Sequence, residues 1–386
     1  MIDPDKPVVA VYVRHYISPS ETFIYRQLHG VSSRFSPIVL TANPSNLDLF
    51  PTDPIFVRGK GFLGKVQTRL LNTISGRYTS LTGDQQRFWT NTLETNKVKL
   101  IHAHFAPFAM DLLPLARKLS IPMLVTLHGA DASVFLNNKK YVQELPGLVD
   151  YARIITVSRN MGVRLQAVGI QLSHHDVHYI GVPVEDFCYV RRKPVREKIA
   201  AGEPVKFLQV SNFIEVKGHR YTIEAFARYA SQQPNTELIL AGAGPLRDPM
   251  EELCGQMGVR DKVRFTGHVS PDEVVALMSD ADAFVLHSVS LADGQMEGLP
   301  TVLMEAMATG LPVISTIHSG IPELIDDGAD GFLVAERDVD TYFARMMGLS
   351  DVAEDIGLAA RKKIEQQFNM TIQNEKLMDI YAETIR

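Results

Sequence analysis

Short apolar runs rich in Val, Ile and Leu recur along the chain, separated by stretches with helical spacing. In the first half the runs lie at 8–13, 37–41, 100–103, 123–126 and 154–157, and helical spacing is clear at 109–119. Continuous apolar strands that alternate with amphipathic helices are typical of a parallel sheet covered on both faces. The first half therefore predicts a doubly wound α/β domain.

A polar, proline-containing stretch at 189–204 interrupts this pattern, which then restarts. Strands are predicted at 206–210, 237–241, 263–265, 283–286 and 312–315, each followed by a helical segment. We therefore predict an α/β protein with two doubly wound Rossmann-like domains, at 1–195 and 196–370, and a last helix at 371–386 that packs back on the first. Ligands of such folds bind at the carboxyl ends of the strands, so a cleft that the two domains face is the expected active site.

Composition narrows the class of protein. With 386 residues, the chain fits two domains of about 150–200 residues each, and its 45% hydrophobic and 22% charged residues are those of a soluble globular protein. No apolar run is long enough to cross a bilayer, and the first residues lack the pattern of a signal peptide. Cys188 and Cys254 are too few for a disulfide framework. A cytoplasmic location is expected, at the cytoplasmic face of a membrane if the protein associates with one.

Charge divides the chain into unlike halves. Through Lys193 there are 22 basic and 14 acidic residues, whereas the remainder has 17 basic and 30 acidic residues. A basic first half could meet an anionic membrane surface or a phosphate-bearing acceptor. Ordinary solvated surface charge is the alternative.

Two glutamates, Glu297 and Glu305, stand seven residues apart around the start of a predicted helix. Pro300 is expected in the first turn of this helix, where its missing N–H costs nothing. A ligand along the helix start could touch both carboxylates. The free N–H groups of Thr301 and Val302 would point at an anion bound there.

This spacing resembles the E-x7-E signature of the retaining GT-B glycosyltransferases of family 4. Four further segments resemble that family's motifs in the expected order: the phosphate loop at 210–218, and the segments at 238–246, 263–268 and 319–324. The resemblance implies a metal-independent glycosyltransferase that uses a nucleotide-diphosphate sugar donor. It implies no cofactor and no nucleic-acid partner.

The resemblance also assigns roles to residues of the second half. Glu297 would bond the hydroxyls of the transferred sugar, aided by the amides of Gly298 and Leu299. Glu305 would bind the ribose, and Lys217 would stabilise the charge that grows on the diphosphate. The other implied donor-binding residues are Asn212, Gly242, Gly244, His268, Val269, Thr301 and Val302.

Two departures from the family pattern change these expectations. Asn212 stands where the family usually has arginine, so the diphosphate would rely more on Lys217 and the helix terminus. Pro300 removes one possible backbone donor to the sugar. The segment Glu-Gly-Leu-Pro that ends at Pro300 is similar to the branch that builds bacterial surface polysaccharides.

The first half resembles the same branch. Its loop at 15–24 is similar to one that follows the first strand of exopolysaccharide and lipopolysaccharide transferases, and Ser20 is a plausible N-cap for a helix that begins near Glu21. His128 matches a histidine that approaches the transferred sugar, which makes it a catalytic candidate with Lys217 and Glu297. Its alternative is a structural histidine that bonds a backbone carbonyl. The implied acceptor-binding residues are Ser20, Glu21, Thr22, His104 and Asp131.

Two patterns that suggest metal binding are set aside. His102 and His104 would point to the same side of a strand, but no further ligands cluster with them in the sequence. Asp280 and Asp282 have the D-x-D form, yet they lie at a predicted helix-to-strand corner. No metal site is predicted.

A basic segment in the first half is a further candidate for binding. Between Asp53 and Asp84 there is no acidic residue, and apolar residues recur there at helical spacing. A basic amphipathic helix can lie in a membrane interface. The alternative is that its apolar face packs on the first domain. The residues concerned are Arg58, Lys60, Lys65, Arg69 and Arg77, with Phe62, Leu63, Val66, Leu70, Leu71 and Ile74.

The sequence is thus interpreted as a hexosyltransferase of surface polysaccharide biosynthesis. The expected donor is a UDP-sugar first and GDP-mannose second, and the acceptor is a glycan or a lipid-linked sugar, with peripheral association with the inner membrane. Two alternatives stay open: a nucleotide-sugar 2-epimerase, and a non-catalytic nucleotide-sugar-binding partner subunit.

Overall fold

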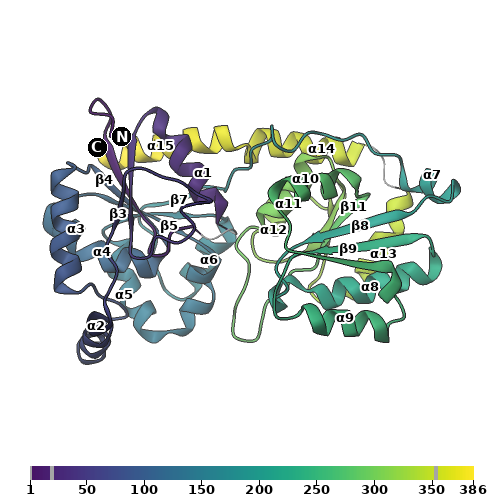
Figure 1. Ribbon diagram of the computed structural model, residues 1–386, viewed down its shortest axis with the longest axis horizontal. Helices are drawn as coiled ribbons and strands as arrows, with labels where there is room; N and C mark the ends of the chain where they lie inside the picture. Colours follow the sequence, from purple (N-terminus) through teal and green to yellow (C-terminus); the bar gives the residue numbers. More distant parts are fainter. Residues whose placement is uncertain (1, 18–20, 352–354) are drawn as a thin grey trace. The chain divides into compact units, whose positions relative to one another are not determined.

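A computed structural model describes residues 2–17, 21–351 and 355–386 of the chain. The chain divides into two units (Figure 1). The first unit comprises the chain up to Gly181 together with Thr371–Arg386, and the second comprises Val182–Met370. The division thus falls at Gly181, ahead of the polar stretch near residue 195 that marked the predicted boundary.

The first unit contains a sheet of seven parallel strands in the order β3-β2-β1-β4-β5-β6-β7. All five residues of β1, β4 and β5 are buried, as expected for a sheet covered on both faces. The strands are β1 Val8–Tyr12, β2 Ser36–Thr41, β3 Ile55–Val57, β4 Leu100–His104, β5 Met123–Leu127, β6 Arg153–Thr156 and β7 His175–Val177.

Helices from both ends of the chain cover one face of this sheet. Ile24 on the first helix and Leu377 and Tyr381 on the last pack with Val9 and Val11 of β1 in one apolar core. Figure 1 shows α15, in yellow, beside α1, in purple. The helices of the unit are α1 Thr22–Gly30, α2 Phe62–Ser75, α3 Gly83–Thr95, α4 Ala106–Leu119, α5 Lys139–Val149, α6 Arg159–Ala167 and α15 Met370–Ile385.

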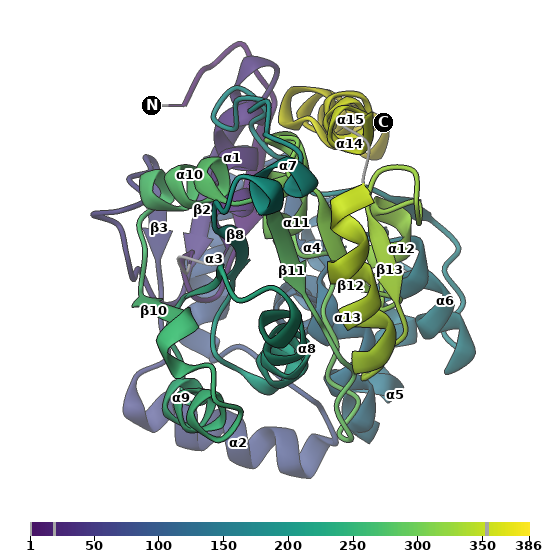
Figure 2. The same cartoon turned by 90° about the vertical axis from the view of Figure 1, so that its right-hand side faces the viewer.

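The second unit contains a sheet of six parallel strands in the order β10-β9-β8-β11-β12-β13. Figure 2 turns this unit toward the viewer and shows α8 near α13, which pack together. The strands are β8 Val205–Val210, β9 Thr236–Ala241, β10 Val263–Gly267, β11 Ala283–Leu286, β12 Val313–Thr316 and β13 Phe332–Val334. The helices are α7 Val195–Ala200, α8 His219–Gln232, α9 Arg247–Gln256, α10 Pro271–Asp280, α11 Thr301–Ala308, α12 Ile321–Leu324, α13 Val339–Gly348 and α14 Asp355–Lys363.

The strand order reverses once in each sheet, between β1 and β4 and between β8 and β11. Consecutive connections leave a parallel sheet in opposite directions at such a point, which opens a crevice at the carboxyl ends of the two strands. The loops after β8 and β11 carry Lys217 and Glu297 respectively. The topology therefore directs both residues to the same edge of the second sheet.

The ten predicted strands and the α/β class are confirmed, with ends that differ by no more than a residue or two. The three strands that the pattern missed are β3, β7 and β13, each of three residues and each at a sheet edge. Their residues are mostly half-buried, so they lack the continuous apolar run that marks a central strand.

We expect the replacement Tyr381→Phe to lower the free energy of unfolding of the first unit by about 1–3 kcal/mol. The buried Tyr381 hydroxyl lies 2.6 Å from Nδ1 of His102, and its loss leaves that nitrogen enclosed without a partner. Trp89 is the single tryptophan of the chain and is fully buried in this unit, so its fluorescence reports the transition in a urea titration.

Tyr25→Phe is the matched control, because the Tyr25 hydroxyl contacts the Pro51 carbonyl at 3.2 Å in an exposed position. Its effect should stay within about 0.5 kcal/mol. Equal effects of the two substitutions would contradict a structural role for the Tyr381–His102 hydrogen bond.

Candidate functional site

The loop after β8 brings Lys217 to the sheet edge through a close backbone approach. Lys217 ends a short 3-10 turn, Glu215–Lys217, and is followed by Gly218 with a φ of +60°. A Cβ at Gly218 would lie 1.8 Å from the carbonyl oxygen of His287, which follows β11. Only glycine fits, and its contact holds the loop after β8 against the end of β11.

Two glycines after β9 serve the same loop. A Cβ at Gly242 would lie 2.0 Å from the Ser211 carbonyl oxygen, and a Cβ at Gly244 would lie 2.6 Å from that of Phe213. The N–H of Gly242 donates to the Gly267 carbonyl at 2.8 Å, so it is already engaged. These glycines, predicted to bind the donor, act in the structure by shaping the loop that carries Lys217.

A buried histidine fixes the far end of this loop. The His219 ring stacks on Phe213 with centroids 4.2 Å apart, and its Nε2 lies 3.1 Å from the Ser211 hydroxyl. Burial, reinforced by the positive charge of Lys217, lowers the pKa of His219 to about 3. The ring therefore stays neutral beside the lysine and adds no repelling charge.

Lys217 and Glu297, both predicted catalytic residues, form an ion pair in the second unit. Lys217 Nζ lies 2.6 Å from Glu297 Oε1, with side chains that are 17% and 9% exposed. The contact has the distance of an ion pair without the angles of a hydrogen bond. Within the described part of the chain, this buried carboxylate oxygen accepts no hydrogen bond. Glu297 thus keeps an acceptor that a ligand hydroxyl could use.

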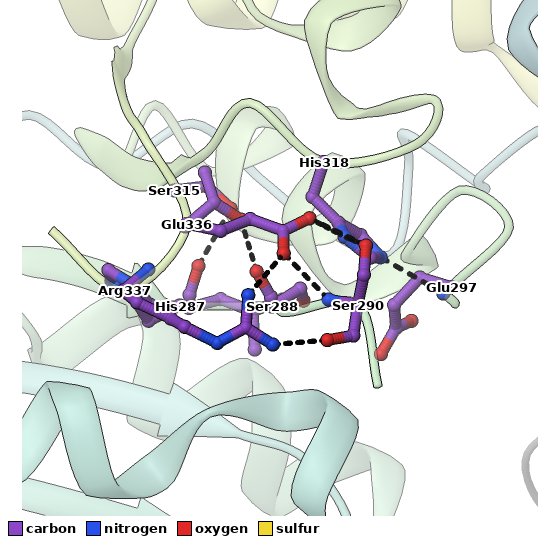
Figure 3. A network of polar contacts seen from close by, with 10 residues as sticks. His287, Ser288, Ser290, Glu297, Ser315, His318, Glu336 and Arg337 are labelled. Atoms are coloured by element: carbon purple, nitrogen blue, oxygen red, sulfur yellow. Dashed lines mark hydrogen bonds and ion pairs between the residues drawn. The ribbon is translucent and has the colours of Figure 1, made fainter. Parts of the chain in front are cut away.

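The backbone of Glu297 is held by a network that Figure 3 shows. Its N–H donates to Nε2 of His318 at 3.0 Å, and Nδ1 of His318 lies 2.6 Å from Oε1 of Glu336. Because Nε2 accepts, Nδ1 carries the proton and donates it to the carboxylate. In the figure the dashed line at Glu297 runs from its backbone nitrogen to His318. The Glu297 carboxylate pairs instead with Lys217.

Glu336 is the centre of that network. It also accepts the N–H and the hydroxyl of Ser290, each at 2.8 Å, and the Arg337 guanidinium at 3.1 Å. Burial acts to raise the pKa of Glu336, but the hydrogen bonds from Ser290 and His318 outweigh it, and the pKa lies below its usual value. Glu336 is therefore ionised and keeps His318 in the tautomer that holds Glu297.

The helix after Glu297 begins one residue later than predicted. α11 starts at Thr301, and Pro300 occupies the N-cap position with extended backbone, so the expectation of Pro300 in the first turn was wrong. The amides of Thr301 and Val302 lie in the first turn, where N–H groups have no intrahelical acceptor, and they form the positive end of the helix. Glu305 lies half-buried inside α11, as predicted.

The other predicted donor residues lie at the ends of the same parallel strands. Asn212 is exposed in the loop after β8, and His268 and Val269 follow β10 as an exposed and a half-buried residue. The Gly298 carbonyl accepts from the Gly320 N–H at 3.4 Å, and Leu299 is buried. Within the predicted set, Lys217 and Glu297 are in direct side-chain contact.

The histidines of the first unit form a buried cluster. The rings of His102 and His104 lie on one side of β4, 4.4 Å apart, as the alternation predicted. His104 Nδ1 lies 3.2 Å from Nε2 of His128, which is 7% exposed. Burial lowers the pKa of His128 to about 3 and that of His104 well below its ordinary value. Both rings are neutral.

Asp131, predicted to orient His128 or bind the acceptor, is fully buried. Its carboxylate accepts the backbone N–H groups of His128 at 2.7 Å and of Ala106 at 2.9 Å. Burial raises the pKa of Asp131 to about 7, although these hydrogen bonds oppose the shift. Asp131 therefore fixes the main chain around His128, and an acceptor contact is incompatible with its enclosure.

The start of α1 differs from the prediction. The helix begins at Thr22 with Glu21 in the N-cap position, and the Glu21 side chain makes no capping hydrogen bond to the described residues. Ser20, the predicted cap and acceptor residue, lies outside the described residues. Glu21 and Thr22 are half-buried.

A polar pocket of about 480 Å³ at the end of β1 was missed from the sequence. Arg14 pairs there with the buried Asp111, and the Thr79 hydroxyl donates to Asp111 at 2.6 Å. The pocket is also lined by Lys60 and Lys65. Arg14 follows an apolar strand as a single basic residue and belongs to no motif, so no sequence signal marked it.

The two patterns set aside as metal sites have other partners. His102 is engaged through Nδ1 by Tyr381 and through Nε2 by the Thr126 hydroxyl at 2.7 Å. Asp282 pairs with Lys198 at 2.6 Å, and Asp280 pairs with Lys206 at 2.8 Å. Within 2–17, 21–351 and 355–386, no three His, Cys, Asp or Glu residues gather as a metal site.

Comparison with known proteins identifies the family. Residues 191–363 match the family described as glycosyl transferases group 1, and residues 21–186 match glycosyltransferase family 4. The amylovoran biosynthesis glycosyltransferase AmsK of Erwinia amylovora is 32% identical over 285 residues, 73% of this chain and 69% of that protein. WcaL of Salmonella typhimurium, assigned to colanic acid biosynthesis, is 30% identical over 344 residues, 83% of each chain. The chain therefore belongs to the group 1, family 4 glycosyltransferases.

The fold agrees with this assignment. The crystal structure of Anabaena HepE in complex with UDP and glucose has a TM-score of 0.75 to this chain, at 16% identity, covering 98% of this chain and all of HepE. Two Rossmann-like units with parallel sheets are the components of the GT-B fold. No helix among the described residues combines the length and the apolar character needed to cross a bilayer.

Sequence reasoning missed the residues that position Glu297. His318 directly precedes the recognised segment at 319–324, so its place was visible while its role was not. Ser290 and Glu336 belong to no recognised segment, and only the fold brings them together.

We expect Glu336→Gln to loosen the Glu297 backbone. The amide keeps the shape of the side chain but has one acceptor oxygen, whereas the carboxylate accepts from both Ser290 and His318. His318 is then held less firmly, and so is the Glu297 N–H that it accepts. Hydrogen–deuterium exchange of a peptide spanning residues 294–299 should accelerate about ten- to hundredfold. Glu252→Gln, an exposed glutamate on α9, is the control. Unchanged exchange in Glu336→Gln would contradict the positioning role.

Proposed function

We propose that the protein is a retaining, metal-independent hexosyltransferase that uses a UDP-sugar and acts in surface polysaccharide biosynthesis. The observation that carries the proposal is the buried Lys217–Glu297 pair at the crevice edge of the second sheet. The relatives AmsK and WcaL, named for exopolysaccharide biosynthesis, support the pathway, and the UDP complex of HepE supports the donor class.

On the donor side, each named group has a chemical task. Glu297, whose Oε1 accepts no hydrogen bond from the described residues, accepts hydrogen bonds from hydroxyls of the sugar, while Glu305 on α11 binds the ribose. Lys217 and the amides of Thr301 and Val302 stabilise the diphosphate as the bond from the anomeric carbon to the phosphate oxygen breaks. Asn212 adds hydrogen bonds without charge.

Lys217 supplies a positive charge for the donor diphosphate, the task that a divalent ion has in other glycosyltransferases. A positioned ammonium and a helix terminus stabilise a leaving diphosphate by the same electrostatic principle as a metal. Asp280 and Asp282, the residues with the metal-binding form, are neutralised by lysines in this fold. These features support transfer without a metal.

Retention follows if the acceptor oxygen bonds the anomeric carbon on the face that the phosphate leaves. The departing phosphate oxygen then takes the proton of the acceptor hydroxyl, so charge and atoms balance. His128 is a proposed catalytic residue of the first unit. With a pKa of about 3 it would act as a neutral hydrogen-bond partner of the sugar, and not as a proton donor.

The acceptor is proposed to be a glycan or a lipid-linked sugar, which places the protein at the cytoplasmic face of the inner membrane. The basic first half of the chain supports an anionic acceptor or surface.

We expect the protein to release UDP from a UDP-hexose in the presence of a membrane extract that supplies acceptor. Lys217→Ala and Glu297→Gln should each lower kcat/KM by at least about a hundredfold, because charge stabilisation and sugar alignment are lost. Glu215→Gln changes an exposed carboxylate of the same turn and should leave the rate within about twofold.

Thermal stabilisation by UDP but not by GDP would support uridine as the base of the donor. Stabilisation by GDP but not by UDP would indicate a GDP-sugar donor instead. The anomeric configuration of the product, determined by NMR, should equal that of the donor, and chelation by EDTA should leave the rate unchanged. If no combination of donor and extract leads to release of UDP, the result would count against glycosyl transfer from a UDP-sugar.

A further inference from the structure

The first turns of α2 present large apolar side chains to solvent. Phe62 is 80% exposed, Leu63 is 81% exposed and Val66 is 55% exposed. Val66 stands four residues after Phe62 and three after Leu63, so it shares one face of the helix with both. The alternative in which this face packs on the first unit is therefore wrong for these three residues. Such a group of exposed apolar side chains is unusual on a protein surface and needs a partner.

A basic groove of about 410 Å³ runs along the same helix. Lys65 and Arg69 line it from successive turns of α2, and Lys140 reaches it from α5, where its ammonium donates to the Asn72 carbonyl at 3.0 Å. The full lining is Lys60, Lys65, Thr68, Arg69, Asn72, Thr73, Arg77, Tyr78, Asn138 and Lys140.

No carboxylate lines the groove among the described residues. The lining contains five basic side chains and no acidic one, and no ion pair joins any of the five to the other described residues. The neighbouring Lys60 is held by the Ser80 carbonyl at 2.5 Å, a neutral acceptor. The groove is thus a preformed site for anionic oxygens.

The groove continues into the pocket at the end of β1. Lys60 and Lys65 line both spaces, so an anion bound by these two lysines would lie where the groove and the pocket meet. A phosphate there could carry a hydrocarbon chain toward the exposed turn of α2 and a polar group toward Arg14 and His15. One ligand class combines these features, namely a lipid with a phosphate headgroup.

We propose that the face of α2 formed by Phe62, Leu63 and Val66, with its basic groove, docks on a bilayer that contains anionic phospholipid, and that Lys60 and Lys65 bind a lipid phosphate. The inference deepens the proposed function, on which it rests, by naming the surface that meets a membrane-borne acceptor. Apolar side chains enter the interface while lysines and arginines bind headgroups, the arrangement of an interfacial helix.

Nucleic acid is the other polyanion that a basic groove could take. Nucleic acid would contact exposed apolar side chains at the helix start through base stacking. Phenylalanine can stack on a base, but leucine has no ring for this contact. The apolar turn beside the groove therefore favours a lipid.

The experiment is co-sedimentation of the full chain with phosphatidylcholine vesicles, with and without phosphatidylglycerol. We expect binding only to vesicles with phosphatidylglycerol. The double substitution Lys65→Gln with Arg69→Gln should lower the partition coefficient at least about tenfold, since each charge contributes about fivefold. Phe62→Ser with Leu63→Ser should weaken it by a similar factor.

Matched controls come from the same unit. Val163→Ser removes another exposed apolar side chain, 62% exposed on α6, and Lys99→Gln with Lys118→Gln removes two exposed charges outside the groove. Both should keep vesicle binding within about twofold. An equal loss in the controls, equal binding to pure phosphatidylcholine, or no effect of the serine pair would each overturn the proposal. Tighter binding to single-stranded RNA, lost in the glutamine pair, would overturn it in favour of nucleic acid.

Thermal stabilisation by UDP, measured on the same samples, separates this proposal from the proposed function. Vesicle binding in a protein that UDP does not stabilise would support the docking surface and count against the donor. Stabilisation by UDP without vesicle binding would overturn the docking surface alone.

Discussion

The ion pair between Lys217 and Glu297 is the interaction on which the second unit is organised as a site. Each residue follows a different central strand, and each is delivered by a loop whose own geometry is fixed elsewhere. Gly218 allows the lysine loop to lie against the His287 carbonyl, and His318 fixes the backbone of Glu297 through Glu336. A buried ammonium and a buried carboxylate stabilise a fold only when both are held in place. Here the neighbouring elements hold both of them.

Much of this organisation was predictable because it is local in sequence. The apolar runs that form the central strands are continuous, since both faces of each sheet are covered. Glu297 and Glu305 lie on either side of the start of one helix, so their spacing is also local. The edge strands β3, β7 and β13 escaped prediction because a three-residue, half-buried strand has almost no pattern. Pro300 was placed one position too far into its helix, which is the usual uncertainty of an element boundary.

What the sequence could not supply is contact between distant residues. Glu336 has no neighbouring signal, and it acquires a role only because β12 and β13 are adjacent in the sheet. For Asp131 the error is different. Its position near His128 in the sequence suggested a contact with the acceptor, but Asp131 is fully buried and accepts the backbone N–H of His128. On α2 the apolar periodicity was read correctly, yet periodicity alone does not say whether an apolar face is covered.

The first unit is completed by residues that follow the whole second unit along the chain. A ribosome that has passed residue 181 has made every strand of the first sheet, but α15 with Leu377 and Tyr381 follows only after the whole second unit. Until then Val9, Val11 and Ile24 lack the apolar contacts that α15 supplies, and Nδ1 of His102 lacks the Tyr381 hydroxyl. The nascent chain therefore carries a partly open apolar face while the second unit is synthesised.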